Sequence, residues 1–469
     1  MLTIGFVLKT LGMESNLETD QVITGGCIDS RLVEPGSLFV ALPGENTDGH
    51  NFVDTALDNG AVLALVEHPV ESQYPVMEIS SLVTEIPKTA FSINVPNTLE
   101  ALQLIATEWR KQFDIPVIGI TGSVGKSSTK ETLAALLGYK FSVLKNPGNM
   151  NNEIGLPLTM ISLNENHQVA VLEMGFYVPG EIKLLCDISQ PQIGIVTNIG
   201  TVHAERAGDL NTISRGKAEL VQALPPAPKG LAVLNQDDPL VLRMASETTA
   251  KVLTYGLTNQ ADLWADQIES FGGEGIEFTA HYAGKVYRLH SKTMGKHSVY
   301  NLLASIGAAL HLGMSWEEID MSLRTVQPMQ RVRLCKSTTG ATIVDDSYNA
   351  SPLSTVAALE LLDELEGEKV AVLGDMLELG QYETEGHQQV LTRALSIAES
   401  IVLIGPRYQK VLQQAVFGNF PQEQIHWFED ASAAAEFLLH TLKKGQTALI
   451  KGSHGMKMYK IIEALEANS

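Results

Sequence analysis

Cysteine is scarce in this chain. Only three of the 469 residues are cysteines, Cys27, Cys186 and Cys335, and no two of them have a Cys-x-x-Cys spacing. The sequence therefore argues against a disulfide framework and against a structural zinc site. Because so few and so widely separated thiols suit a reducing compartment, we expect a cytoplasmic protein.

Long hydrophobic runs are also absent. No apolar stretch approaches the ~20 residues that a membrane-spanning helix needs. The first residues, Met1–Lys9, do not combine a basic region with a long apolar segment and a small-residue cleavage site. We expect neither a membrane span nor export.

Positive charge is the third shortage. Lys and Arg number 33 against 54 Asp and Glu, which gives a net charge of −21. An acidic surface repels the phosphates of DNA and RNA, and no segment gathers a basic patch, so we expect no nucleic-acid partner. An apolar fraction of 44% is typical of a soluble globular protein, and the length predicts two to four domains.

The pattern of apolar and polar stretches divides the chain into three α/β regions. We predict an N-terminal domain at 1–95, a central domain at 96–326 and a C-terminal domain at 327–469. Strands that alternate with helices predict parallel sheets, which bind ligands at the carboxyl ends of their strands. The predicted strands are 37–42, 62–66, 117–120, 168–172, 193–197, 230–234, 341–344, 369–373, 400–404 and 447–450; the predicted helices are 51–59, 98–113, 297–312, 354–365 and 387–399; and residues 262–292 look like an antiparallel β insert.

The most informative stretch of the sequence is Val117–Glu131. An apolar strand begins it, a helix ends it, and between them lies the loop Gly122-Ser123-Val124-Gly125-Lys126-Ser127-Ser128. The backbone N–H groups of such a loop and the positive end of the helix dipole suit the phosphates of a nucleotide. We predict that Lys126 reaches the outer phosphates of a nucleoside triphosphate and that the Ser127 hydroxyl faces a Mg²⁺ ion. The usual pattern has a further glycine where this chain has Ile120, so the loop is shorter than in most nucleotide hydrolases.

Three other residues of the central region are candidates for metal binding. Glu173 ends an apolar strand, where a carboxylate is well placed to hold Mg²⁺ opposite Ser127; the alternative is a carboxylate that caps a loop. His203 follows another strand end, although a lone loop histidine is more often not a ligand. Lys217 lies on a predicted helix, and periodicity alone makes it a surface lysine.

Polar residues also follow the strands of the third region. Asp345 and Asp346 precede Ser347-Tyr348-Asn349 and indicate a polar site at a strand end, or else the N-cap of a helix that begins near Pro352. Asp375 follows the next strand and has the same two interpretations. Lys451 follows the last strand, where it suits an anionic ligand or simply a basic turn.

Together these motifs resemble the Mur ligase family, ATP-dependent ligases that build the peptide stem of bacterial peptidoglycan. The family's short phosphate loop, Gly-x-x-Gly-Lys-[Ser/Thr]-[Ser/Thr], matches Gly122–Ser128 and accounts for Ile120. Ser30-Arg31, with residues 35–44 and 48–50, resembles the UDP-sugar domain of the later-acting members. The segments 149–157, 345–352 and 373–380 are most similar to the members that add D-alanyl-D-alanine to UDP-N-acetylmuramoyl-tripeptide.

The resemblance implies roles for individual residues. Ser127 and Glu173 would bind one Mg²⁺, and His203 a second, with Lys217 as the lysine that the family carries as a carbamate. Lys126, Lys217 and His203 would be the catalytic residues. ATP would be bound by Gly122, Ser123, Val124, Gly125, Lys126, Ser127, Ser128, Asn301, Arg331 and Asp346, and the other substrates by Ser30, Arg31, Asn149, Asn152 and Asn349.

The resemblance also implies an architecture and a reaction. It predicts a small N-terminal α/β UDP-sugar domain, a central parallel-sheet P-loop ATPase-like domain and a C-terminal Rossmann-like domain. The reaction would phosphorylate the tripeptide carboxylate with ATP and then join it to D-alanyl-D-alanine, so the partners are small molecules and we expect a monomer. Whether the third residue of the tripeptide is lysine or diaminopimelate stays open.

The chain departs from the family pattern at four places. It has His297-Ser298 for His-Asn, Gln330-Arg331 for Gly-Arg, Ser351-Pro352 for Asn-Pro and His454 for the arginine of Lys-Gly-Ser-Arg. These departures leave the ATP chemistry intact and bear on the recognition of the other substrates.

Two alternatives to this function stay open. One is a related ligase that adds an amino acid to a different acid, and the other is a nucleotide-binding homologue that has lost catalysis. A GTPase or a kinase is not expected, because the chain has neither a guanine-specifying Asn-Lys-x-Asp motif nor the longer phosphate loop.

Overall fold

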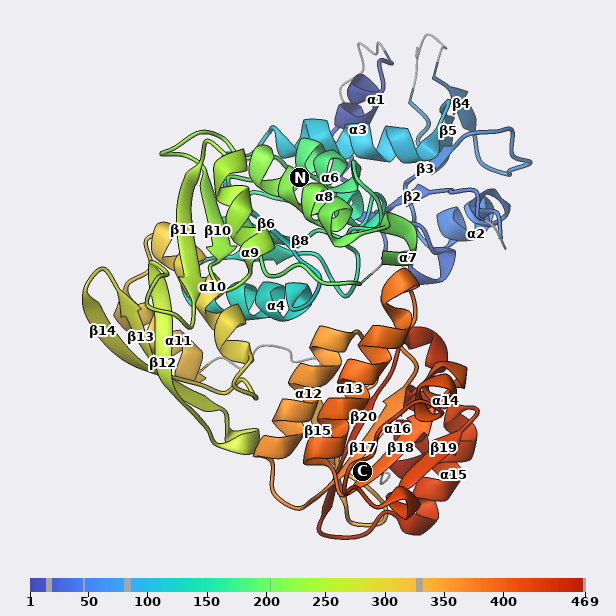
Figure 1. Cartoon of the computed structure of the whole chain (residues 1–469). Coiled ribbons are helices and arrows are strands. Elements are labelled where there is room, and N and C mark those ends of the chain that lie inside the picture. The colour runs from blue at the N-terminus through green and yellow to red at the C-terminus, as the bar shows by residue number, and fades with distance from the viewer. Residues whose placement is uncertain (14–18, 45–46, 80–85, 203, 326–331, 467–469) are drawn as a thin grey trace.

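Three β-sheets follow one another along the chain (Figure 1). The computed structural model describes residues 1–13, 19–44, 47–79, 86–202, 204–325 and 332–466. Each sheet is flanked by helices, which confirms the predicted α/β architecture of three domains. The domain boundaries at 95/96 and 326/327 stay predictions.

The first sheet is parallel, with the strand order β1-β2-β3-β5-β4. The predictions of strands at 37–42 and 62–66 and of a helix at 51–59 are confirmed, with shorter elements. Helix α3 (Thr98–Arg110) follows, is capped by the side chain of Asn97, and ends before Phe113, where the predicted helix ends. The other elements here are α1 (Ile4–Thr10), β1 (Gly26–Cys27), β2 (Leu38–Val40), α2 (Val53–Asp58), β3 (Leu63–Val66), β4 (Val76–Glu78) and β5 (Phe91–Asn94).

The central sheet has the strand order β14-β13-β12-β11-β10-β9-β6-β8-β7. It is parallel from β7 to β12 and antiparallel from β12 to β14. The segment 262–292 contains antiparallel strands, as predicted, and β12 joins them to the central sheet by pairing in parallel with β11. The strands are β6 (Val117–Thr121), β7 (Val143–Lys145), β8 (Val169–Glu173), β9 (Ile193–Val196), β10 (Leu231–Asn235), β11 (Lys251–Gly256), β12 (Leu263–Ser270), β13 (Ile276–Tyr282) and β14 (Lys285–Ser291).

Helices cover both faces of the central sheet, and this explains its continuous apolar strands. Successive side chains of a strand point to opposite faces, so Val171 of β8 packs with α4 and α10, whereas Leu172 packs with α3, α5, α6 and α8. The second of these cores also contains Leu38 and Phe91 of the first sheet, so the N-terminal and central regions share one core. The helices are α4 (Lys126–Leu137), α5 (Gly155–Ile161), α6 (Glu181–Ser189), α7 (Ala204–Ala207), α8 (Leu210–Gln222), α9 (Pro239–Arg243), α10 (Ser298–His311) and α11 (Trp316–Thr325).

The third sheet has the strand order β15-β16-β20-β17-β18-β19. It confirms the four strands and the two helices predicted for this region. The edge strand β15 is antiparallel to β16, and neither β15 nor β19 was predicted. The elements are β15 (Arg333–Lys336), β16 (Thr342–Asp346), α12 (Pro352–Glu364), β17 (Glu368–Gly374), α13 (Glu383–Ile397), β18 (Ser400–Ile404), α14 (Pro406–Leu412), β19 (Ile425–Phe428), α15 (Ala431–Thr441), β20 (Gln446–Lys451) and α16 (Tyr459–Leu465).

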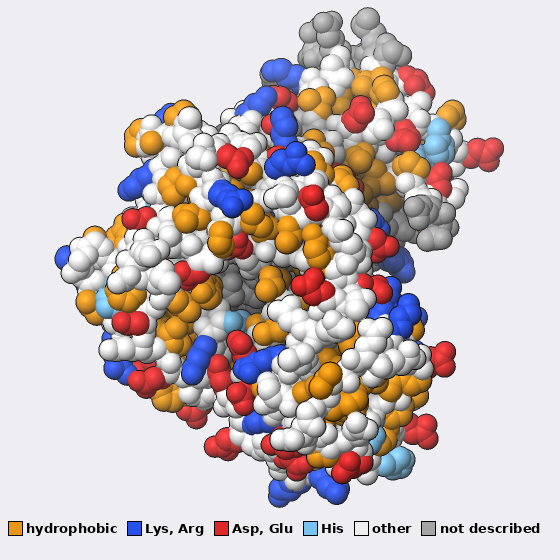
Figure 2. Space-filling view, in the orientation of Figure 1, with side chains coloured by type: hydrophobic (Ala, Val, Ile, Leu, Met, Phe, Trp, Pro, Cys, Tyr) orange, Lys and Arg blue, Asp and Glu red, His pale blue; other side chains and the backbone are white. Residues whose placement is uncertain are grey.

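A cavity of about 780 Å³ lies between the central and C-terminal regions. The space-filling view shows a hollow between them (Figure 2). Its lining comes from the loops after β6, β8, β9, β10 and β16, which is where parallel sheets present ligand-binding residues. No helix in the described parts of the chain is long and apolar enough to cross a membrane.

Candidate active site

The phosphate loop is held in place by the end of strand β9. Gly122 has a φ of +147°, and a Cβ there would lie 1.8 Å from Thr197 Oγ1, so only glycine fits. Thr197 Oγ1 donates to Val124 O at 2.6 Å, and the N–H groups of Ser123 and Val124 donate to the backbone and side-chain oxygens of Asn198. The amides that remain for a phosphate therefore begin at Gly125 and continue into the first turn of α4, whose N–H groups have no acceptor within the helix.

Two lysines converge on the carbonyl oxygen of Gly122. Lys126 Nζ donates to it at 2.9 Å and Lys217 Nζ at 3.0 Å. Lys217 is buried and lies over the ring of Phe176, with Nζ 4.7 Å from the ring centroid. Burial, with the nearby ammonium of Lys126, lowers the pKa of Lys217 well below its ordinary value. The interpretation of Lys217 as a surface lysine is therefore wrong, because the face of α8 that carries it packs inward.

Ser127 and Glu173 face each other at the cavity wall. Ser127 Oγ donates to Glu173 Oε2 at 2.5 Å, and Asn151 Nδ2 donates to Glu173 Oε1 at 2.8 Å. The carboxylate of Glu173 is buried, and all three residues line the cavity. A hydroxyl and a carboxylate are hard oxygen ligands, so this pair fits Mg²⁺.

The C-terminal region contributes a second charged pair to the same cavity. Lys451 Nζ lies 2.5 Å from Asp346 Oδ2 and donates to Asn349 O at 2.9 Å. Lys451 is buried and lines the cavity, so it is not a solvated basic turn; its interpretation as an anion ligand stays a prediction. The side chain of Asp345 accepts hydrogen bonds from Ser347 instead.

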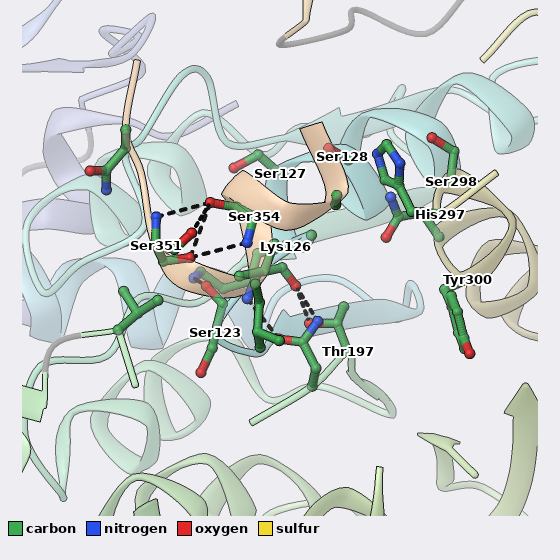
Figure 3. A pocket seen from close by; sticks show the side chains of 18 of the residues that line it. Ser123, Lys126, Ser127, Ser128, Thr197, His297, Ser298, Tyr300, Ser351 and Ser354 are labelled. Carbon is green, nitrogen blue, oxygen red and sulfur yellow. Dashed lines mark hydrogen bonds between the residues drawn. The ribbon is translucent and has the colours of Figure 1, made fainter. Parts of the chain in front are cut away.

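The alternative that Asp345 or Asp346 caps a helix is wrong. The N-cap of α12 is Ser351, whose hydroxyl accepts from Ser354 N, while the Ser354 hydroxyl accepts from Ser351 N; the close-up view draws these bonds (Figure 3). Asp375 accepts from the backbone N–H groups of Arg407 and Tyr408 at the start of α14 and does not line the cavity. Its role is structural.

Helix α10 forms another wall of the cavity. Asn301 Oδ1 accepts from Thr129 Oγ1 at 3.2 Å and lies against Gly125 of the phosphate loop. His297 and Tyr300, both labelled on the right of Figure 3, also line the cavity. Tyr300 donates to Asp237 Oδ2 at 3.0 Å, whereas His297 Nδ1 is buried without a hydrogen-bond partner in the described part of the protein. Burial lowers the pKa of His297.

Outside the cavity, the described residues contain one group with the composition of a metal site, Asp48, His50 and His68. His50 Nε2 accepts from the backbone N–H of Glu67 at 2.9 Å, so Nδ1 carries the proton and donates to Asp48 Oδ1 at 2.6 Å. Both nitrogens of His50 are occupied in this tautomer. We therefore do not assign a metal to the group.

Comparison with known proteins identifies the family. Three family models match the chain: Mur ligase family, catalytic domain, at residues 22–110; Mur ligase middle domain, at 120–309; and Mur ligase, glutamate ligase domain, at 330–454. A curated UDP-N-acetylmuramoyl-tripeptide–D-alanyl-D-alanine ligase from Synechocystis sp. is 34% identical over 99% of this chain and 96% of its own length. This chain belongs to the Mur ligase family.

Other relatives agree along the whole length of the chain. The Bacillus subtilis protein of the same name is 32% identical over 97% of this chain and 96% of its own length. A crystal structure of MurF from Acinetobacter baumannii matches with a TM-score of 0.84 and 28% identity, covering 98% of both chains. MurF ligase from Thermotoga maritima, solved in complex with ADP, matches with a TM-score of 0.79 and 27% identity over 95% of this chain and 98% of its own.

The structure brings most of the predicted Mur ligase site together. Residues at the cavity are Ser123, Val124, Gly125, Lys126, Ser127, Ser128, Asn149, Glu173, Asn301, Asp346 and Asn349. Gly122, the first residue of the phosphate loop, and Lys217, which donates to its carbonyl oxygen, do not line the cavity. His203 and Arg331 lie outside the described residues.

Three residues predicted to bind substrate do not line the cavity. Asn152 Oδ1 accepts from Gly155 N at 2.9 Å, at the start of α5. Arg31 is exposed and pairs with Asp29 in the N-terminal domain, and Ser30 is buried beside it, where its carbonyl accepts from Asn59.

Sequence reasoning missed several cavity residues. Asn151 lies inside a motif that was singled out, but only the fold shows that it, and not Asn152, reaches Glu173. Asp237 follows strand β10 much as Glu173 ends β8. It could have been predicted from its position at the carboxyl end of a parallel strand, where ligands bind. Asn198 follows strand β9 in the same way, whereas nothing local in the sequence singles out Tyr300.

Proposed function

We propose that this chain is an ATP-dependent, ADP-forming ligase that joins D-alanyl-D-alanine to UDP-N-acetylmuramoyl-tripeptide. The names of the full-length relatives support this reaction. The observation that carries the proposal is the phosphate loop with Lys126, placed at the same cavity as the Ser127–Glu173 pair. The structure of a relative with bound ADP supports nucleotide binding.

In this proposal, the two domains hold ATP between them. Lys126 and the amides from Gly125 onward bind the β- and γ-phosphates, and Asn301, Arg331 and Asp346 contact the nucleotide. Ser127 and Glu173 would hold one Mg²⁺, and His203 with a carbamate on Lys217 would hold a second. Bound there, Mg²⁺ neutralises charge on the phosphates and orients them.

The first step activates the acid. A carboxylate oxygen of the tripeptide attacks the γ-phosphorus of ATP, the bond to the bridging oxygen breaks, and ADP leaves. Negative charge spreads over the transferring group, and the ammonium of Lys126 stabilises it. The product is an acyl phosphate.

The second step forms the amide. The neutral amine of D-alanyl-D-alanine attacks the acyl carbon, the bond to the phosphate oxygen breaks, and inorganic phosphate leaves as the nitrogen loses a proton. Because acyl phosphates react with water, the site must exclude it. A cavity between two domains achieves this by closing over the bound substrates.

One assay tests the reaction. ADP release is measured with UDP-N-acetylmuramoyl-tripeptide, with and without D-alanyl-D-alanine, and with single amino acids as acceptors. We expect sustained release only with the dipeptide, and a loss of about 10³-fold in Lys126→Ala. Release with a different acceptor would identify a related ligase, and binding without release would identify a non-catalytic homologue. The cytoplasmic location and the monomeric state stay predictions.

A further inference from the structure

A buried lysine that the reaction does not use lies one helical turn beyond Lys126. Lys130 of α4 is 1% exposed. Its ammonium donates to Asn146 O at 2.8 Å and to Gly148 O at 3.1 Å, and lies 3.3 Å from Glu131 Oε1. These contacts can satisfy the three donors of an ammonium. Lys130 therefore ties α4 to the loop that follows β7.

Asn146 ties the same loop to Glu173. This fully buried side chain accepts from Glu173 N at 2.9 Å and donates to Glu173 O at 2.9 Å. It thereby fixes the backbone of Glu173 from both sides. Further along the loop, Asn151 donates to the carboxylate of Glu173.

These contacts close a ring around the candidate metal ligands. Ser127 and Lys130 lie on one helix, three residues apart. Ser127 bonds to Glu173, Glu173 to Asn146, and the carbonyl of Asn146 to Lys130. The relative position of Ser127 and Glu173 is thus set by a second set of bonds besides their own.

We propose that Lys130 and Asn146 are positioning residues for nucleotide-bound Mg²⁺, which lock Glu173 opposite Ser127. The proposal rests on the proposed function, since it takes Ser127 and Glu173 as the oxygen ligands. Burying an ammonium carries a desolvation cost that an apolar side chain of similar size avoids. The ammonium of Lys130 provides hydrogen bonds between α4 and the loop that orients Glu173, which an apolar side chain could not make.

The test measures ADP binding by calorimetry with and without Mg²⁺ on the full chain. In the wild type, Mg²⁺ strengthens ADP binding. We call the ratio of ADP affinities with and without Mg²⁺ the gain from Mg²⁺. In Lys130→Met, we expect the affinity for ADP without metal to stay within about 2-fold of the wild type, because the phosphate loop is intact. The gain from Mg²⁺ should fall by at least ~10-fold, which is the effect typical of losing a residue that orients a metal ligand. Asn146→Ser removes the clamp on Glu173 but keeps the backbone carbonyl that Lys130 uses, and should lose the gain in the same way.

Lys145→Met is the matched control. Lys145 pairs with the same Glu131, but its side chain is 41% exposed and it precedes the loop, so the gain from Mg²⁺ should persist. If both Lys130→Met and Asn146→Ser keep the same gain from Mg²⁺ as the wild type, the proposal is overturned, even if their melting temperatures fall. If Lys130→Met does not fold, Asn146→Ser decides alone. Absence of any Mg²⁺ gain in the wild type would instead contradict the proposed function.

Discussion

At the scale of single residues, burial decides which charges are available for chemistry. Lys126 and Lys217 contact the same carbonyl oxygen, but only Lys126 lines the cavity. Lys217 lies behind the loop, where burial and the ammonium of Lys126 lower its pKa and so shift its protonation equilibrium toward the neutral amine. A neutral amine is the form that reacts with carbon dioxide, so the environment of Lys217 supports the carbamate that the family resemblance implies.

We therefore predict a carbamate on Lys217. With ¹³C-labelled bicarbonate, the wild type should show a carbamate carbon signal by NMR that Lys217→Arg lacks, because a guanidinium stays protonated. Lys183→Arg is the control, since Lys183 is exposed and paired with Asp187. A carbamate signal that persists in Lys217→Arg would assign the modification elsewhere.

At the scale of elements, the residues of the candidate site lie at the starts of helices and at the ends of strands. The cap of α12 illustrates this, because Ser351 both caps the helix and lines the cavity. The family pattern has asparagine at this position, and serine and asparagine are both good N-caps. The departure at Ser351 thus keeps the function of a helix cap.

Substitutions of Ser351 measure how much its role as the N-cap of α12 contributes to stability. Ser351→Ala should lower the free energy of unfolding by about 1 kcal/mol, while Ser351→Asn should retain most of it. Urea unfolding monitored by circular dichroism measures both. Equal stability of the alanine and asparagine variants would show that the cap contributes little.

His387 links the loop after β17 to α13 and predicts a dependence on pH. Its Nε2 accepts from Met376 N at 2.9 Å and its Nδ1 donates to Glu383 O at 2.6 Å, so the folded ring is neutral; burial lowers its pKa. The unfolded ring titrates near pH ~6.5. The contribution of His387 to stability is therefore complete above that pH and is lost as the pH falls from there toward the lower pKa of the folded state.

Replacing His387 should flatten this dependence. Between pH 7.5 and pH 5, the melting temperature of His387→Gln should fall less than that of the wild type. The exposed His440 gives a control, and His440→Gln should keep the wild-type slope. A slope for His387→Gln as steep as that of the wild type would place the sensitive group elsewhere.

At the scale of the whole molecule, the reaction depends on how the central and C-terminal regions meet. One of their contacts outside the cavity is the hydrogen bond from Glu205 N of α7 to Glu378 O at 3.2 Å. Gly380 packs beside this contact with a φ of +54°, and a Cβ there would lie 3.1 Å from the backbone of Glu205. This contact holds the C-terminal loop against the segment that follows His203.

Gly380→Val should disturb this contact and leave nucleotide binding in place. We expect turnover to fall by about 10²-fold, because small misplacements of reacting groups are costly, with ADP affinity little changed. Gly418→Val is the matched control, since Gly418 has a φ of +57° but nothing within 4 Å of its Cβ position. Wild-type turnover in Gly380→Val would show that the contact does not position the domains for catalysis.

The local predictions succeeded where chain neighbours decide the structure. The strand, loop and helix around Lys126 depend on residues a few positions apart. The local pattern of 262–292 predicts its antiparallel strands but contains no sign of the pairing of β12 with β11, which joins them to the central sheet. The burial of Lys217 was missed for the same reason.

By itself, the sequence determined the order of strands and helices, the phosphate loop with its glycines, and the resemblance to the Mur ligases, because all of these follow from the spacing of side chains along the backbone. Only the tertiary structure decided which distant residues meet. Strand β6 lies between β8 and β9. This order brings Glu173 opposite Ser127, as the strand-end position predicts, but it also brings Asn198 to the phosphate loop, which was not predicted. Sheet order reflects the packing of many side chains at once, so no short stretch of sequence contains it.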